Sequence, residues 1–240
     1  MNYTLIFAGG VGQRMNTVSL PKQFLKVHGK EIIVHTIEHF QKNNNIDGIV
    51  VVCVKEYIGL MEQLKERYAL SKILCIVCGG NSGQESIWFG LRALKNYIKS
   101  ENDVVLIHDG VRPLIEQQTI DDNISCVYKY GTCITVAKPI ETILIMGEHE
   151  NINQVLDRSK CYVGRAPQSF YFKDIYACHT KSNSLGLHDF VDSSMMMQHF
   201  GYKIHTVLGP VYNIKVTTPM DFYMFKAILD ARENEQVKVL

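Results

Sequence analysis

The chain has 240 residues, a length that suits one full-sized domain, and 46% of them are hydrophobic, which is enough to bury a sizeable core. Lysine and arginine number 25 and aspartate and glutamate 24, which gives a formal net charge of +1. This balance argues against a nucleic-acid-binding protein, because such domains are normally clearly basic. The longest dense apolar run, Ile49 to Val54, is far shorter than the roughly 20 residues that a membrane-spanning helix needs. We therefore expect no nucleic acid and no membrane among its partners.

The N-terminal residues and the cysteines favour a cytoplasmic location. The chain starts without a basic region followed by an apolar stretch, so its beginning does not resemble a secretory signal. Seven cysteines, an odd number, are scattered from Cys53 to Cys178 without the pattern of a disulfide framework. The sequence thus predicts a reduced, cytoplasmic protein.

Short runs rich in valine and isoleucine alternate with helix-length segments through the first half of the chain. The runs lack the polar alternation of half-exposed strands, which is typical of parallel strands that are covered on both faces. Strand–helix alternation of this kind predicts a Rossmann-like α/β fold, a mostly parallel sheet with helices on both faces. The expected strands are Tyr3–Ala8, Gly48–Val54, Lys72–Cys78, Val104–His108 and Thr132–Val136, and the expected helices are Glu31–Lys42, Glu56–Tyr68, Gln84–Lys99 and Gln117–Tyr130.

The alternation breaks after Pro139. Two apolar stretches, Ile140–Met146 and Ile152–Leu156, flank the polar segment Gly147–Asn151 and predict a β-hairpin. A lone two-stranded ribbon is marginal in water, so an arm over about residues 139–162 either packs on a partner subunit, giving a homodimer, or folds back onto its own sheet. No linker marks a second domain, so residues 1–240 are expected to form one domain that carries this arm.

Lys215 falls on an expected strand near the C-terminus, between Ile214 and Val216. On an alternating strand it would point away from both neighbours. Such a lysine is either a solubility device on an edge strand or a phosphate ligand. The elements expected beyond the arm are a helix over Phe190–Phe200, strands over Ile204–Val207 and Asn213–Val216, and a last helix from about Pro219.

Three glycines follow the first expected strand, in Ala8-Gly9-Gly10-Val11-Gly12-Gln13-Arg14. Without side chains there, backbone amides can approach a phosphate closely. The loop is not a dinucleotide fingerprint, because Met15 stands where the third glycine belongs, and it is not a P-loop, because no Lys-Ser/Thr pair follows Gly12. Arg14 and Lys22 are placed to clamp a triphosphate from two sides; alternatively, Lys22 is a solvated loop lysine.

A second glycine loop, Gly79-Gly80-Asn81-Ser82-Gly83-Gln84-Glu85-Ser86, follows the third expected strand and leads into a helix. Small polar side chains and free amides at a helix N-terminus suit the edge of a base or a phosphate. Ser82 and Glu85 also have the spacing of a capping box. The two interpretations are compatible with each other.

Asp109 ends a buried expected strand, and Arg112 follows three residues later. At the ligand-binding edge of a parallel sheet, such an aspartate can hold a Mg²⁺ that bridges nucleotide phosphates. The guanidinium of Arg112 can reach an anionic substrate with two hydrogen bonds. In the structural alternative, Asp109 caps the following turn and pairs with Arg112.

In this order, the motifs resemble those of the polyol-phosphate cytidylyltransferases, a family that includes the enzymes for ribitol 5-phosphate and 2-C-methyl-D-erythritol 4-phosphate. The resemblance extends from about Tyr3 to Ala231. Several motifs in fixed order are far more specific than one glycine loop. The motifs are Ala8-Gly9-Gly10, Gly12, Arg14-Met15, Pro21-Lys22-Gln23-Phe24, Gly79-Gly80, Ser86, His108-Asp109, Arg112-Pro113, Pro167-Gln168, Phe170 and Asn213-Ile214-Lys215.

The resemblance implies transfer of CMP from CTP to a polyol phosphate, with Mg²⁺ as cofactor and a homodimer joined through the arm. It places the triphosphate at the glycine loop, the α-phosphate between Lys22 and Lys215, and cytosine and ribose near the second glycine loop. Residues implied for CTP are Ala8, Gly9, Gly10, Gly12, Arg14, Lys22, Gly80, Asn81, Ser86 and Asp109, the last also for the metal; those for catalysis are Arg14, Lys22 and Lys215; those for the acceptor are Arg112 and, from the neighbouring subunit's arm, Thr142 and Arg158.

Three positions depart from the family pattern and bear mainly on the acceptor. Gly83 replaces a frequent basic residue, Ala166 replaces a threonine hydroxyl, and Glu141 replaces an aspartate. Val111 before Arg112 favours ribitol 5-phosphate over methylerythritol phosphate, whose enzymes more often have alanine there. Arabinitol or mannitol phosphate is an alternative acceptor, and a CTP-binding regulator without turnover or a nicotinamide dehydrogenase is an alternative function.

Overall fold

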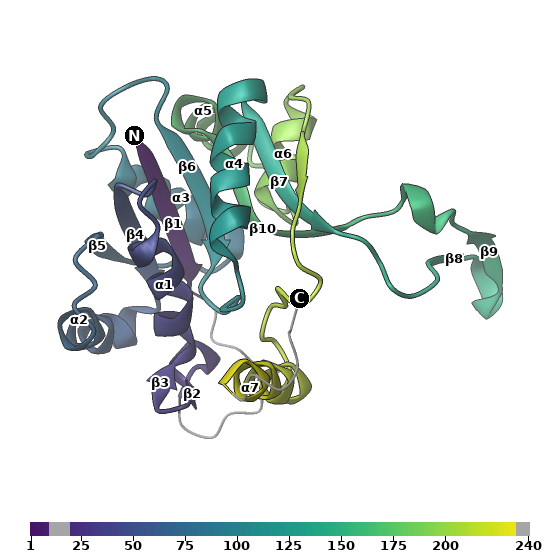
Figure 1. Ribbon diagram of the computed structural model, residues 1–240. Helices are drawn as coiled ribbons and strands as arrows, with labels where there is room; N and C mark the ends of the chain where they lie inside the picture. Colours follow the sequence, from purple (N-terminus) through teal and green to yellow (C-terminus); the bar gives the residue numbers. More distant parts are fainter. Residues whose placement is uncertain (10–19, 234–240) are drawn as a thin grey trace.

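A computed structural model describes residues 1–9 and 20–233, and its centre is a seven-stranded sheet (Figure 1). The strand order is β11-β7-β10-β6-β1-β4-β5. The pairs β1–β4, β1–β6, β4–β5 and β11–β7 are parallel. The expected mostly parallel sheet is therefore confirmed. The strands are β1 (Asn2–Ala8), β4 (Gly48–Cys53), β5 (Ile73–Cys78), β6 (Val104–Asp109), β7 (Thr132–Ala137), β10 (Val163–Tyr171) and β11 (Thr206–Leu208).

Strand β10 is antiparallel to both of its neighbours, β6 and β7, and was not expected from the sequence. Its first half contains Gly164, Arg165 and Pro167, which do not form the apolar run of a buried strand. The register also shifts between Gly164 and Gln168, so the strand is irregular where it pairs with β7. Proline and glycine are tolerated at such irregularities, which explains why the sequence did not indicate a strand.

Helices cover both faces of the sheet, as expected (Figure 1). The side chains of β1 alternate between the two layers: Ile6 packs in one apolar cluster, whereas Tyr3 and Leu5 pack in the other. The helices α1, α2 and α4 cover the first face, and α3, α5 and α6 cover the second. Their bounds are α1 (Ile32–Lys42), α2 (Ile58–Arg67), α3 (Gly83–Leu94), α4 (Gln117–Tyr130), α5 (Phe172–Ser184) and α6 (Ser193–His199), of which α5 was not expected.

The C-terminal helix α7 (Pro219–Glu233) closes a third, smaller apolar cluster with the two-stranded sheet of β2 (Lys26–Val27) and β3 (Lys30–Glu31). The expected strand over Asn213–Val216 is wrong, because these residues form no strand. The Val216 amide instead donates a single hydrogen bond to the Val111 carbonyl, 2.8 Å away. Val216 is nevertheless buried and the Lys215 side chain 41% exposed, so the two side chains diverge as expected.

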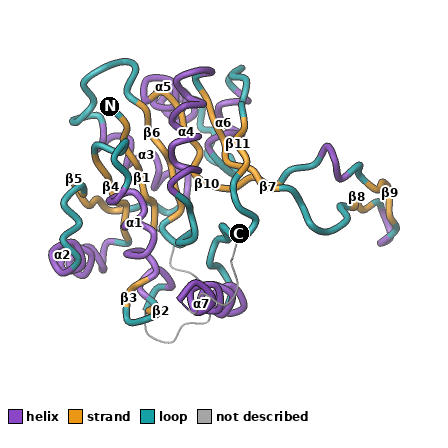
Figure 2. The backbone as a smooth tube through the Cα atoms, in the orientation of Figure 1, coloured by secondary structure: helices purple, strands orange, loops and turns teal. Residues whose placement is uncertain are grey.

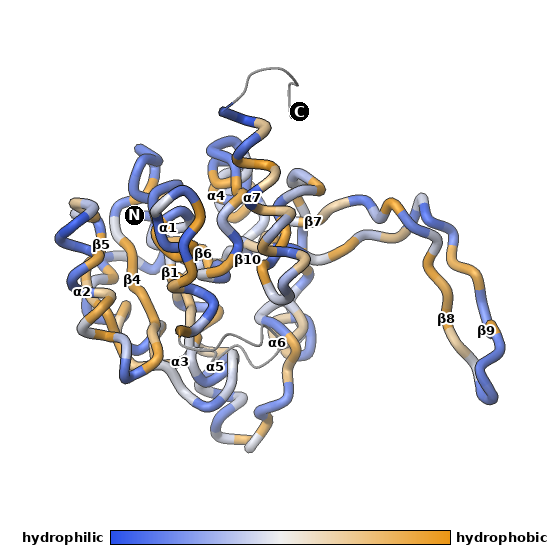
Figure 3. The backbone as a smooth tube through the Cα atoms, turned by 90° about the horizontal axis from the view of Figure 1, so that it is seen from below, coloured by the Kyte–Doolittle hydropathy of each residue, from blue (hydrophilic) through white to orange (hydrophobic). Residues whose placement is uncertain are grey.

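The arm leaves the body between β7 and β10 and carries the separate hairpin of β8 (Leu144–Met146) and β9 (Ile152–Val155) (Figures 1 and 2). Leu144 pairs with Val155, and the expected hairpin is confirmed. Every residue of both strands is exposed, and Figure 3 shows hydrophobic positions along the arm far from the body. The hairpin does not fold back onto its own sheet. Within the described ranges, moreover, no helix combines the length and hydropathy needed to cross a bilayer.

Candidate active site

The two glycine loops meet at the carboxyl ends of β1 and β5. A side chain at Gly9 would lie 2.6 Å from Ser86 Oγ, and one at Gly79 would lie 3.1 Å from the Gly9 Cα atom. The Gly80 amide donates a hydrogen bond to Ser86 Oγ, 3.1 Å away, which fixes the second loop against the start of α3. The structure therefore brings together Ala8, Gly9, Gly80 and Ser86. Glycine is required at Gly9 and Gly79 because a Cβ atom there would lie too close to the facing loop.

The N-terminus of α3 is capped as its sequence indicates. The Ser82 hydroxyl accepts a hydrogen bond from the Glu85 amide at 3.1 Å. The Glu85 carboxylate accepts from the Asn81 amide at 2.6 Å, one residue before the position of a standard capping box. Asn81 itself is exposed beside this turn. Capping and a nucleotide-binding role remain compatible here.

Lys22 opens a short 3-10 turn, η2 (Lys22–Phe24), and is half-buried. The neighbouring Gln23 is buried, and its side-chain amide donates a hydrogen bond to the Ala8 carbonyl, 2.9 Å away. This bond holds the Lys22 turn at the end of β1, where the glycine loop begins. Three further expected phosphate contacts, Gly10, Gly12 and Arg14, lie outside the described residues.

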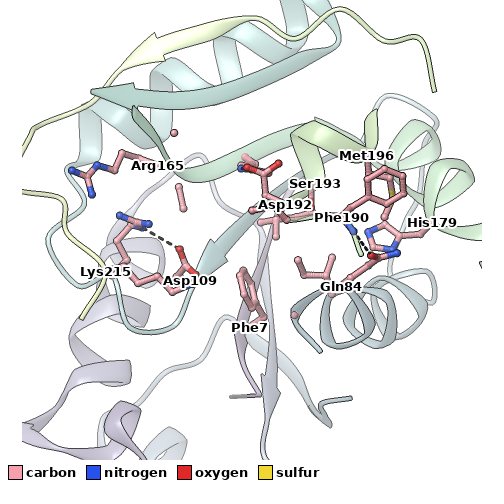
Figure 4. A pocket seen from close by; sticks show the side chains of 18 residues that line it. Phe7, Gln84, Asp109, Arg165, His179, Phe190, Asp192, Ser193, Met196 and Lys215 are labelled. Carbon is pink, nitrogen blue, oxygen red and sulfur yellow. Dashed lines mark hydrogen bonds and ion pairs between the residues drawn. The ribbon is translucent and has the colours of Figure 1, made fainter. Parts of the chain in front are cut away.

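Asp109 at the end of β6 forms two ion pairs, with Lys215 at 2.6 Å (Figure 4) and with Arg112 at 3.1 Å. Burial by itself would raise the pKa of the Asp109 carboxyl, but the two cations outweigh it and lower the pKa to about 2. Asp109 is therefore a carboxylate at all physiological pH values. Arg112 also donates to the Asn213 carbonyl at 2.7 Å, so the turn after β6 is tied to the segment that carries Lys215.

His108 precedes Asp109 but faces the interior. It is fully buried, its ring centroid lies 5.0 Å from that of Phe40, and its Nε2 donates a hydrogen bond to the Arg112 carbonyl at 3.1 Å. Burial lowers its pKa to about 3, so the imidazole is neutral at physiological pH. Its contacts stabilise the turn that presents Asp109 and Arg112.

A cavity of about 320 Å³ extends from this ion-pair cluster to the helices of the second face (Figure 4). Its cationic end holds Lys215, Arg112 and Arg165 beside Asp109. Its opposite end is lined by side chains from α3, α5, α6 and the segment between α5 and α6. These are Gln84, Ile87, His179, Phe190, Asp192 and Met196. The cavity thus offers an anion-binding end and an end that, among the described residues, has no cation and whose one carboxylate is that of Asp192.

Arg165 adds a cation that our sequence analysis did not assign to the site. It comes from β10 and lines the cavity, and its Nε atom is buried and has no hydrogen-bond partner within the described ranges. Burial, and then the nearby Arg112 charge, lower the pKa of its guanidinium. Of these two neighbouring arginines, Arg112 pairs with Asp109, whereas Arg165 forms no ion pair among the described residues, and such a cation favours an anionic ligand.

The described residues do not form a metal site by themselves. Both oxygens of Asp109 already accept from cations, and no group of three or more His, Cys, Asp or Glu side chains in residues 1–9 and 20–233 is arranged to hold an ion. Mg²⁺ is usually held by one or two carboxylates together with substrate phosphates and water. A metal carried by nucleotide phosphates therefore fits this cavity edge, with Asp109 as the carboxylate of the cationic end, and an ion held by protein alone does not.

Thr142 and Arg158 lie on the arm and do not reach the cavity of their own chain (Figure 1). The Arg158 guanidinium donates to the Ile140 carbonyl at 2.7 Å, across the base of the arm. The structure therefore brings together Asp109, Arg112 and Lys215, but it does not place Thr142 or Arg158 beside them within one subunit.

Several residues that line the cavity were not predicted from the sequence. His179 and Phe190 approach the site only because α5 packs against α3, a contact that no local pattern encodes. Gln84 does lie in the second glycine loop, but its role here is to bond the Leu187 carbonyl and the Phe190 amide. The Asp192 carboxylate caps α6 by accepting a hydrogen bond from the Met195 amide. An aspartate just before an apolar run is the one sequence signal that could have indicated this residue.

A sheet with glycine turns and a cationic cavity at its carboxyl edge defines a nucleotide-binding α/β protein. The family model described as 2-C-methyl-D-erythritol 4-phosphate cytidylyltransferase matches residues 3–231. The chain belongs to this family, and it is an enzyme of the nucleotidyltransferase class.

Individual relatives narrow the comparison. The chain is 48% identical to the ribitol-5-phosphate cytidylyltransferase of Streptococcus agalactiae serotype Ia, over 99% of both chains. It is 44% identical to the protein of the same name from Vibrio parahaemolyticus, again over 99% of both. Among solved structures, 4-diphosphocytidyl-2C-methyl-D-erythritol synthase from Anaerococcus prevotii is similar, with a TM-score of 0.81 and 27% identity over 95% of this chain and 96% of that one.

Proposed function

We propose that the protein transfers CMP from CTP to D-ribitol 5-phosphate, giving CDP-ribitol and pyrophosphate. The observation that carries this proposal is the 48% identity, over essentially full length, to a protein named ribitol-5-phosphate cytidylyltransferase. The cavity agrees with it, because a cationic end suits a phosphate, and the polar side chains of the other end suit the hydroxyl groups of an uncharged chain. Val111 before Arg112 favours the same acceptor.

The acceptor's own phosphate supplies the nucleophile. The second pKa of a phosphate monoester is about 6, so the group is largely dianionic at neutral pH and needs no general base. One of its oxygens bonds to the α-phosphorus of CTP, while the bond from that phosphorus to the oxygen bridging to the β-phosphate breaks. Pyrophosphate leaves with the electron pair.

The cations of the site neutralise the charge that develops around the α-phosphorus. Lys215 is oriented for this by Asp109 at 2.6 Å, and its ammonium lies 5.8 Å from the centre of the Phe7 ring. Lys22 is held at the end of β1 through its neighbour Gln23. Arg14 is assigned to the triphosphate on its sequence motif alone. Positioning and charge neutralisation are therefore the catalytic contributions of this chain.

Mg²⁺ is proposed to enter with the phosphates of CTP, near Asp109. Bound there, it would supply positive charge to the phosphate oxygens and to the leaving pyrophosphate. Asp109 is suited to a position beside the metal because its lowered pKa keeps the carboxylate charged. Lys215 and Arg112 compete for the same carboxylate oxygens.

The arm is proposed to join two copies of the chain into a homodimer and to deliver Thr142 and Arg158 to the partner's acceptor. Support comes from its apolar side chains, which are exposed in one subunit; Met146 is 56% and Val155 60% exposed. Exposed apolar surface of this kind marks an interaction site. We also place the enzyme in the cytoplasm, consistent with its seven free thiols.

Methylerythritol phosphate is the second candidate acceptor, and the description of the matching family favours it. A panel assay separates the two. Purified protein with CTP and Mg²⁺ is offered ribitol 5-phosphate, methylerythritol phosphate, arabinitol phosphate or mannitol phosphate, and pyrophosphate is measured. We expect the fastest release with ribitol 5-phosphate. Faster pyrophosphate release with another polyol phosphate would make that compound the acceptor. Binding of CTP without pyrophosphate release for any acceptor would indicate a regulator.

A further inference from the structure

The end of the cavity away from Lys215 contains a histidine whose ring nitrogens make no hydrogen bond to a described residue. His179, on α5, is 1% exposed and lines the cavity with Gln84 and Phe190 (Figure 4). Its ring is parallel to that of Trp88, with a centroid distance of 6.0 Å. Neither ring nitrogen has a hydrogen-bond partner among the residues that the structure describes. A buried nitrogen without a hydrogen-bond partner costs free energy. The two ring nitrogens of His179 therefore indicate that a ligand supplies their partner.

The other polar groups at this end are already committed to the protein. The Gln84 side-chain amide donates to Ser182 Oγ and to the Leu187 carbonyl, and its oxygen accepts from the Phe190 amide. The Asp192 carboxylate accepts from the Met195 amide and from the Gln168 side chain. These bonds build the wall, whereas His179 faces the cavity without a protein partner.

The chemistry of the proposed reaction decides which part of the acceptor reaches this end. The acceptor phosphate must lie at the cationic end, beside Lys215, because it attacks phosphorus there. The rest of the acceptor therefore extends away from the cations, toward α3 and α5. That remainder is a chain of hydroxyl groups, each of which can both donate and accept a hydrogen bond.

We propose that His179 determines specificity for the acceptor by hydrogen-bonding a hydroxyl of the polyol chain remote from its phosphate. This inference rests on the proposed function. The neutral imidazole has one donor and one acceptor nitrogen, which match a hydroxyl or two adjacent hydroxyls. Burial lowers the pKa of His179 to about 4, so the ring stays neutral at physiological pH and does not act as another cation for the phosphate. The stack on Trp88 fixes the plane of the ring.

The test compares His179→Phe, which keeps a stacked ring but removes both hydrogen bonds, with the wild type. We expect the KM for ribitol 5-phosphate to rise about tenfold, the value of one neutral hydrogen bond, while the KM for CTP stays the same. His179→Gln, which retains a donor and an acceptor, should recover part of this loss. His205→Phe is the matched control, because His205 is also stacked on an aromatic ring, Tyr130, but does not line the cavity.

A series of deoxyribitol 5-phosphates, each lacking one hydroxyl, adds a readout that a structural role would not change. For the analogue without the contacted hydroxyl, wild type and His179→Phe should have the same KM. An unchanged KM for ribitol 5-phosphate in His179→Phe, or an equal loss across the whole series, would overturn the inference while leaving the proposed function intact. Failure of the wild type to use any polyol phosphate would overturn both.

Discussion

The carboxyl edge of the sheet and the arm differ in where their side chains find contacts. At the edge, Asp109 and Arg112 are buried charges that are fully paired within one chain. On the arm, Leu144 and Val155 are apolar and exposed, with only each other as cross-strand partners. The ion pairs of the first region form within one subunit, whereas the second region presents surface that a further copy can cover. Perturbing each in turn should therefore give different outcomes.

The largest effect is expected at the edge, from Lys22→Ala. Removal of one preorganised contact to the transition state typically slows turnover about 10²–10³-fold. Steady-state pyrophosphate release at saturating CTP and ribitol 5-phosphate measures it. Lys173→Ala is the control, because it removes a lysine whose ion pair with Glu101 lies on the surface. Near-normal release by Lys22→Ala would remove Lys22 from the catalytic site.

The arm is tested by charging its apolar pair with the double substitution Leu144→Asp and Val155→Asp. We expect light scattering to report a monomer in place of a dimer, and the KM for ribitol 5-phosphate to rise because the partner's Arg158 no longer reaches the site. Leu208→Asp, at a residue 58% exposed on the body, should leave the mass unchanged. A dimer that survives the double substitution would show that another surface joins the subunits.

Arg158→Ala sharpens the comparison with a smaller change on the same arm. Loss of a charge-assisted contact costs about 1.5–3 kcal/mol, which raises the KM for ribitol 5-phosphate by roughly 10–150-fold. The KM for CTP should not change, because the arm is assigned to the acceptor. Lys160→Ala, on the same arm, is the control and should have little effect. A raised KM for CTP alone would contradict the assignment.

The smallest expected effect concerns stability below neutral pH, and it arises in the buried region. Burial lowers the pKa of His108 to about 3 and those of His39 and His179 to about 4, whereas all three titrate near 6.5 when unfolded. The unfolded state therefore binds more protons as the pH falls through 6.5. Each histidine should reduce the unfolding free energy by about 1 kcal/mol between about pH 7.5 and 5.5.

Urea unfolding at the two pH values measures this loss. His179→Phe should reduce the pH dependence of the unfolding free energy by the contribution of one histidine. The arm has no buried residue in β8 or β9 and is not expected to contribute. Equal stability at both pH values would show that these imidazoles are not buried as neutral groups in solution.

The same division explains how much could be predicted from the sequence. Elements with local patterns were predicted well: the continuous apolar run of β6 and the helix over Gln117–Tyr130 are both confirmed. Strand β10 was missed because Gly164 and Pro167 interrupt its pattern, and its position between β6 and β7 depends on long-range pairing. The strand expected at Lys215 was wrong because one backbone bond to Val111 holds that segment without a ladder.

The site shows the same limit. Motifs indicated Asp109, Arg112 and Lys215, and the structure brings the three together. The ion pair between Asp109 and Arg112 agrees with the structural interpretation of Asp109, and its role as a metal ligand stays a prediction. Nothing in the sequence indicated Arg165 or His179, because both reach the cavity through the packing of elements distant in the chain. Arg14, Gly10 and Gly12 lie outside the described residues, so their assignment stays a prediction.

Strand β10 begins where the arm returns to the body, and its residues Gly164, Arg165, Ala166 and Gln168 form one wall of the cavity. Subunit association and acceptor binding would then act on a single strand. Thermodynamic reciprocity requires that, if pairing of two copies tightens binding of the acceptor by some factor, the acceptor strengthens the pairing by the same factor. Dilution in the absence of substrate should accordingly separate the subunits more readily than dilution at saturating ribitol 5-phosphate.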